Sequence, residues 1–141
     1  MNRIEYHVLK RAMIKTGILN PQLLSLLARV RHTNTLVIAD CGFPFWPQIE
    51  TVDLSLVDDV PTVRQVLAAV RAQCVFGKAW MAKDFLQHNP PATRRAFAAA
   101  FRGMALTHEP HLDFKRRVSQ AIGLIRTGDT TPFGNVILES A

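Results

Sequence analysis

The chain has 141 residues, of which 48% are hydrophobic and 20% are charged, as expected for one soluble globular domain with its own core. Its formal net charge of +6 suggests nucleic-acid binding, but the basic clusters fall on helical patterns without a nucleic-acid-binding motif, so we assign them to solvated helix faces. No segment reaches the about 18 apolar residues of a membrane helix, and the N-terminus lacks a signal peptide, so we expect a cytoplasmic protein with no membrane and no nucleic-acid partner.

The chain begins with a short extension and a first helix. Residues 1–12 carry mixed charge and show no clear pattern. Asn20 is a favourable helix cap, and Pro21 suits the first helical position. Apolar residues follow at helical spacing, so the sequence predicts a helix from this point to about Arg31.

Two strands are predicted next, with a loop between them. Residues 35–39 form a short, nearly continuous apolar run rich in β-branched side chains, which is typical of a strand buried on both faces of a parallel sheet. Residues 40–42 end this run, and residues 43–47 (FPFWP) indicate a rigid aromatic loop. The second strand is predicted at residues 51–56.

The middle of the chain alternates helices and strands. Pro61 opens a predicted helix that continues to about Cys74, and residues 75–81 are predicted to form a strand. A pair of prolines at residues 90–91 begins a further helix that runs through Phe101.

The C-terminal part continues this alternation. An extended segment covers residues 104–107, a helix begins near His111, and residues 135–138 form a final strand. Residues 122–127 fit either a strand or the end of the preceding helix. Alternating helices and short buried strands indicate an α/β layered domain.

The first candidates for chemistry are His32 and Asp40. His32 closes the predicted first helix, and Asp40 lies at the carboxyl end of the first buried strand, where ligands bind in open α/β sheets. A carboxylate that accepts an imidazole N–H fixes the tautomer of the ring, and the other ring nitrogen can then exchange protons near neutral pH. The alternative is that the histidine ends a helix and the aspartate caps a turn.

Two further groups lie near predicted element ends. His111 and Lys115 project from one face of the first turn of a helix, where they suit hydrogen bonding to a polyol or support of an oxyanion. In the turn at residues 131–135, Asn135 offers a donor and an acceptor, and Phe133 offers a stacking surface. The structural alternatives are a solvated helix start and a phenylalanine that fills the core.

Cofactor and metal motifs are missing from the sequence. It contains no P-loop, no Gly-x-Gly-x-x-Gly and no His-Glu-x-x-His, and Cys41 and Cys74 lack the spacing of metal ligands. We therefore expect a protein without a metal or a cofactor. Two cysteines are also too few for a disulfide scaffold, which favours a reducing compartment. His88 and His108 have no obvious partner and are interpreted as surface residues.

Three segments, taken in order, resemble the D-ribose pyranase and L-fucose mutarotase family. They are TGILNPQLLSLLARVRHTNTLVIADCGFP, VDLSLVDDVPTVRQVL and HLDFKRRVSQAIGLIRTGDTTPFGNVIL. The resemblance implies a single three-layer α/β/α domain over residues 13–141 with a mainly parallel sheet, and it leaves residues 1–12 outside. It also implies a ring-shaped homo-oligomer, a pentamer or a decamer, in which the aromatic loop at residues 43–47 is expected to face a neighbouring subunit.

The resemblance also implies roles for individual residues. It makes His32 the catalytic acid/base and Asp40 its catalytic partner, which also contacts the sugar. The other implied sugar contacts are His111, Lys115, Phe133, Gly134 and Asn135. His111 favours the ribose branch of the family, whereas Gly134 is closer to the fucose branch.

The implied function is that of an isomerase. Such an enzyme interconverts the cyclic forms, pyranose and furanose or the two anomers, of a free monosaccharide such as D-ribose by acid/base catalysis. Three positions depart from the family pattern, because Phe133 replaces a tyrosine, Asn34 an aspartate and Arg31 a glycine. The alternative is a non-catalytic monosaccharide-binding or regulatory protein of the same fold, in which turnover was lost with the tyrosine hydroxyl.

Overall fold

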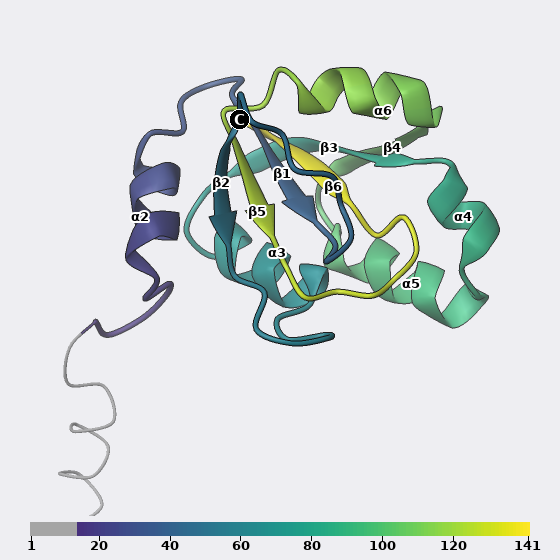
Figure 1. Ribbon diagram of the computed structural model, residues 1–141, viewed down its shortest axis with the longest axis horizontal. Coiled ribbons are helices and arrows are strands. Elements are labelled where there is room, and N and C mark those ends of the chain that lie inside the picture. Colours follow the sequence, from purple (N-terminus) through teal and green to yellow (C-terminus); the bar gives the residue numbers. More distant parts are fainter. Residues whose placement is uncertain (1–13) are drawn as a thin grey trace, which may run out of the picture.

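The computed structural model describes residues 14–141, which form one six-stranded sheet with helices on both faces (Figure 1). In chain order the elements are α2 (Pro21–Ala28), β1 (Thr35–Ala39), β2 (Glu50–Asp53), α3 (Val63–Arg71), β3 (Phe76–Ala82), α4 (Asp84–His88), α5 (Pro91–Ala100), β4 (Ala105–Glu109), α6 (His111–Val118), β5 (Gly123–Arg126) and β6 (Val136–Ser140). The predicted extension, residues 1–12, lies outside the described residues. No helix in the described part of the chain is long and apolar enough to cross a membrane.

The sheet is mainly parallel, as predicted. Its strand order is β2-β5-β1-β6-β3-β4. Only β6 runs antiparallel to its two neighbours, β1 and β3, whereas the other pairs are parallel. Five strands therefore end at one edge of the sheet, where β6 begins. We refer to this edge as the carboxyl edge.

Two buried clusters join the sheet to its helices and make three layers. In Figure 1, α6 lies on one side of the sheet, and α3 and α5 lie on the other. Side chains alternate along β1, so Leu36 and Ile38 pack against the α3 side, whereas Val37 and Ala39 pack against the α6 side with Phe114. Both faces of β1 are therefore buried, which explains its continuous apolar sequence and confirms the predicted α/β fold.

Helix caps agree with the sequence in part. Asn20 caps α2 as predicted, because its side chain accepts a hydrogen bond from the Leu23 N–H at 2.9 Å. α3 begins two residues after Pro61, because Thr62 and Gln65 form a capping box that satisfies early backbone groups of the helix.

Two predicted elements require correction, one open segment is settled, and one helix was missed. The first helix ends at Ala28, so His32 lies in the turn before β1 and does not close the helix. The strand predicted at residues 51–56 ends at Asp53, and residues 122–127, which fitted two interpretations, contain β5. α4 was missed because five residues are too few to show a helical period.

Candidate functional site

A cavity of about 430 Å³, here called the candidate pocket, opens at the carboxyl edge of the sheet. Its walls come from the loop after β1, the beginning of α6 and the loop between β5 and β6. The volume lies within the range of small-molecule sites. Five predicted site residues line the candidate pocket, namely Asp40, His111, Lys115, Phe133 and Asn135.

The meeting of β1 and β6 positions Asp40 and Asn135. Because these strands are antiparallel neighbours, the residue after β1 lies beside the residue before β6. The Asp40 N–H donates a hydrogen bond to Asn135 Oδ1 at 2.7 Å, and Asp40 Oδ1 accepts the Gly42 N–H at 3.1 Å. The carboxyl group is therefore held by its own turn at the pocket wall.

Burial raises the pKa of Asp40 above its ordinary value. The Asn135 side chain and the Gly42 N–H oppose this increase, whereas the negative charge of Asp129 adds to it. Asp40 therefore keeps its proton to a higher pH than an exposed aspartate does. A carboxyl group of this kind is suited to exchanging protons with a bound ligand.

Asp129 was not a candidate in the sequence, yet it lines the candidate pocket. It is only 3% exposed, and its carboxylate accepts the Val63 N–H and the Thr131 N–H, each at 2.8 Å. Its backbone carbonyl accepts the Cys41 N–H at 2.9 Å. Asp129 thus joins the start of α3 to two loops of the pocket. Its contact with Thr131 is local, but its partners Val63 and Cys41 lie far away in the sequence, so no local motif could reveal this connecting role.

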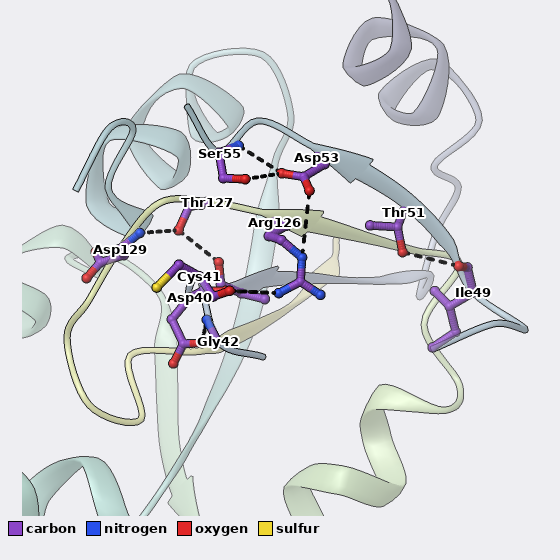
Figure 2. A network of polar contacts seen from close by, with 11 residues as sticks. Asp40, Cys41, Gly42, Ile49, Thr51, Asp53, Ser55, Arg126, Thr127 and Asp129 are labelled. Atoms are coloured by element: carbon purple, nitrogen blue, oxygen red, sulfur yellow. Dashed lines mark hydrogen bonds and ion pairs between the residues drawn. The ribbon is translucent and has the colours of Figure 1, made fainter. Parts of the chain in front are cut away.

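Arg126 contacts the loop after β1, as Figure 2 shows. Its Nη1 donates to the carbonyl oxygens of Asp40 and Cys41 at 3.4 Å and 3.3 Å, and its Nε lies 4.0 Å from Asp53 Oδ2. The same network contains the Thr127 hydroxyl, which accepts the Asp129 N–H. These contacts order the backbone around Asp40.

Two polar atoms in residues that line the candidate pocket are buried without a hydrogen-bond partner among residues 14–141. They are Nδ1 of His111 and Nε1 of Trp46. Buried polar groups are paired in most proteins, because leaving one unpaired costs about 1–3 kcal/mol. The arrangement therefore offers hydrogen-bonding capacity that suits a ligand with several hydroxyl groups. Lys115, one turn after His111, adds a positive charge.

The aromatic loop lies closer to its own chain than expected. Phe43 is only 8% exposed and packs in the cluster on the α6 side, and Trp46 is half-buried beside it. Phe45 alone among the three is 69% exposed. The expectation that the whole loop faces a neighbouring subunit is therefore wrong for Phe43, which is buried in its own chain, whereas Trp46 is only partly covered.

Phe133 lies between two histidines. Its ring centroid is 4.9 Å from that of His88 and 5.9 Å from that of His111. Its backbone has a φ of 54°, in the left-handed region, and the turn is closed by the Gly134 N–H, which donates to the Thr131 carbonyl at 3.1 Å. Gly134 itself is buried, and an added Cβ would lie 3.1 Å from that carbonyl oxygen.

His32 does not join the other predicted site residues within one chain. It precedes β1, whereas Asp40 follows it, and five residues of strand span about 13 Å between their end Cα atoms. His32 is exposed, in a turn in which Asn34 Oδ1 accepts the Arg31 N–H at 2.8 Å. A hydrogen bond between His32 and Asp40 of the same chain is therefore not formed. The strand predicted between them already placed them at opposite ends.

Within the described residues, no group of three or more His, Cys, Asp or Glu side chains could hold a metal ion.

Several known proteins are similar to this chain. D-ribose pyranase of Chromobacterium violaceum is 42% identical over 128 residues, covering 91% of this chain and 97% of that protein. D-ribose pyranase of Geobacillus kaustophilus is 40% identical over 128 residues, covering 91% and 93%.

Solved structures agree with this similarity. The structure of Bacillus subtilis RbsD complexed with D-ribose superposes with a TM-score of 0.84 at 31% identity, covering 92% of this chain and 98% of that one. A fucose mutarotase from Streptococcus pneumoniae shares the fold, with a TM-score of 0.67 at 18% identity over 86% of this chain and 92% of that one. The model of the RbsD / FucU transport protein family matches residues 13–141. The chain therefore belongs to the RbsD / FucU family.

Proposed function

We propose that this protein is a monosaccharide mutarotase, an isomerase acting on D-ribose or a related free aldose in the cytoplasm. One observation carries the proposal. The pocket that gathers Asp40, His111, Lys115 and Asn135 lies in a fold that superposes closely on a protein solved with D-ribose. The relatives of about 40% identity that are named D-ribose pyranase support the same activity.

The reaction opens and recloses the sugar ring. A base removes the proton from the anomeric hydroxyl while an acid gives a proton to the ring oxygen, which breaks the bond between C1 and that oxygen. Closure reverses both transfers, with a different hydroxyl or with the other face of the carbonyl. Proton transfer at positioned side chains contributes about 100-fold to 10,000-fold to such reactions. This chemistry requires no group transfer and no change of oxidation state.

The histidine of this reaction comes from a second copy of the chain. His32 and the candidate pocket lie at opposite edges of the sheet, so one copy supplies the imidazole and its neighbour supplies Asp40. The Asp40 carboxylate then accepts the N–H of the neighbour's imidazole and supports its protonated form. Joining opposite edges is a head-to-tail contact, which closes into a ring when the rotation allows it. A pentamer, or a decamer of two rings, satisfies this geometry.

Two exposed apolar side chains adjoin pocket residues in the sequence, and we refer to them as the pocket rim. Phe45 and Leu112 are 69% and 68% exposed, and they adjoin the pocket residues Trp46 and His111 in the sequence. Exposed apolar side chains that gather around a site indicate a protein contact. We assign this rim to the neighbour that carries His32.

Replacing Phe45 and Leu112 together by serine is expected to weaken assembly and exchange in parallel. The double variant removes the apolar rim and leaves the pocket side chains in place. Sedimentation at micromolar concentration should give smaller species than the parent. Leu56→Ser, at a residue that is 76% exposed and does not line the pocket, is the matched control. A monomeric but fully active parent would contradict the shared site.

Phe133→Tyr is expected to raise exchange of D-ribose by no more than about tenfold. A hydroxyl adds one hydrogen bond, with a net value of about 0.5–1.5 kcal/mol, or roughly threefold to tenfold. Saturation-transfer NMR of D-ribose measures the rate directly. A parent that is inert on every aldose, with activity restored by Phe133→Tyr, would instead support the non-catalytic sugar-binding protein.

The test of the function itself is saturation-transfer NMR of the parent protein with a panel of free aldoses. Exchange between cyclic forms that exceeds the uncatalysed rate for at least one sugar supports the mutarotase. Binding without exchange favours the sugar-binding alternative. Salt-dependent binding to nucleic acid, without any effect on sugars, would reject both.

A further inference from the structure

We propose that the end of α4, formed by His88 and Asn89, positions the sugar-contact loop at residues 131–135. Neither residue lines the candidate pocket, so both act through Phe133 and the backbone next to it. They are positioning residues for the proposed reaction, and the inference rests on the proposed function of the pocket. α4 had no role in the sequence analysis, in which His88 was interpreted as a surface residue.

Asn89 ties the loop to α4. The side chain, in a residue that is only 9% exposed, donates two hydrogen bonds from Nδ2, to the Phe85 carbonyl at 2.9 Å and to the Pro132 carbonyl at 2.8 Å. One carbonyl belongs to α4, and the other directly precedes Phe133. Both N–H groups of the amide are thus used, so the contact requires a side chain with two donors.

His88 holds the other side of the loop through its ring. The imidazole Nδ1 lies 2.9 Å from the Asp84 carbonyl, which can only accept, so Nδ1 carries a proton. This hydrogen bond orients the ring toward Phe133, at 4.9 Å between centroids and 46° between planes. The Phe133 ring also meets His111 edge to face, at 5.9 Å between centroids and 87° between planes. The three rings thus form a row of contacts that links α4 to the pocket.

Phe133 needs this support for two reasons. Its φ of 54° is unfavourable for a residue with a side chain, so the surrounding contacts must hold the turn. Its ring also has no hydroxyl through which a hydrogen bond could hold it. The ring position therefore depends on packing between His88 and His111. Because Phe133 and His111 both line the pocket, a shift of this row changes the space for the sugar.

The first test is a pair of variants at His88. His88→Ala removes the ring contact and is expected to raise KM for D-ribose about fivefold with a smaller change in kcat, because it loosens binding and not proton transfer. His88→Phe keeps an aromatic ring at this position and is expected to restore KM to within about twofold of the parent. Gln87→Ala, at an exposed residue on the same helix, should match the parent. Equal damage from His88→Phe and His88→Ala would overturn the proposal.

The second test needs no sugar. Aromatic NMR of the full chain reports the Phe133 ring signals and their contacts with His88 and His111. Both His88→Ala and Asn89→Asp should shift these signals, since a carboxylate at position 89 cannot donate to the two carbonyls. His88 is exposed, so His88→Ala keeps this test interpretable even if Asn89→Asp fails to fold. Unchanged Phe133 signals in His88→Ala would reject the positioning role, whereas a parent inert on sugars would reject only the proposed function.

Discussion

His32→Ala is expected to reduce sugar exchange by about 100-fold to 10,000-fold, which is the usual contribution of a general acid/base. His32 is exposed in the turn before β1, so the fold and its thermal stability should change little. Saturation-transfer NMR gives the rate, and circular dichroism gives the melting temperature. An exchange rate equal to that of the parent would remove His32 from the mechanism.

A mixing experiment tests where His32 acts. Copies carrying His32→Ala are co-expressed with copies carrying Asp40→Asn, and mixed oligomers are purified through two different tags. Each site takes His32 from one copy and Asp40 from its neighbour, and in a mixture of equal parts each of these residues is intact in about half of the copies. About a quarter of the sites in a random mixture therefore combine an intact His32 with an intact Asp40. Mixed oligomers should therefore regain about a quarter of the parental rate. No recovery in verified mixed oligomers would contradict a shared site.

Asp40→Asn is expected to lower exchange about 100-fold or more while leaving sugar binding largely intact. An amide cannot take up a proton or support the charge of the neighbour's imidazole, although it still forms hydrogen bonds to hydroxyl groups. Asp58→Asn removes an exposed carboxylate that does not line the pocket and is the matched control. Comparable loss in both variants would mean that net charge, and not the Asp40 position, matters.

The raised pKa of Asp40 determines how the exchange rate of the parent protein depends on pH. Burial is its main cause, so the carboxyl takes up a proton at a higher pH than an exposed aspartate. Since the mechanism uses the ionised form, the rate of the parent should fall as the pH decreases through this raised pKa. Asp129→Asn removes a negative charge that contributes to the increase, and it should therefore move this decline to lower pH.

The raised pKa of Asp40 does not by itself destabilise the fold as the pH falls. A group whose pKa is higher in the folded state than in the unfolded state stabilises the fold increasingly as the pH falls through that range. For Asp40, stability and activity therefore change in opposite directions with decreasing pH. Measuring the melting temperature alongside the rate separates the two effects. A parallel loss of both would show that another group controls the decline.

Local sequence patterns were enough to predict most helices and strands of this fold. Strand β1 was predicted at residues 35–39 with the bounds that the structure shows, because a strand buried on both faces has a continuous apolar sequence. The cap at Asn20 was also predictable, because a capping side chain acts within its own turn. α4 was not predictable, since its five residues show no period and its role lies in contacts with a loop more than 40 residues away.

The residues of the candidate site also divide into those that the sequence predicts and those that it does not. Asp40, His111 and Asn135 could be proposed from the sequence, because each lies at the end of a predicted element and such ends meet at one edge of a parallel sheet. Asp129 and Asn89 could not, because each also binds a distant partner, Val63 at 66 residues and Pro132 at 43 residues away in the sequence.

By itself, the sequence determined the family, the layered α/β architecture and most of the side chains that the candidate pocket gathers. These properties follow from apolar periodicity, caps and strand ends, which act within a few residues. Only the tertiary structure decided that Asp129 joins the start of α3 to the pocket, that Asn89 ties the loop at residues 131–135 to α4, and that Phe43 is buried against its own chain. Contacts between residues far apart in the sequence depend on how the strands pair and in which direction each strand runs. A pattern along the chain specifies neither the pairing nor the direction.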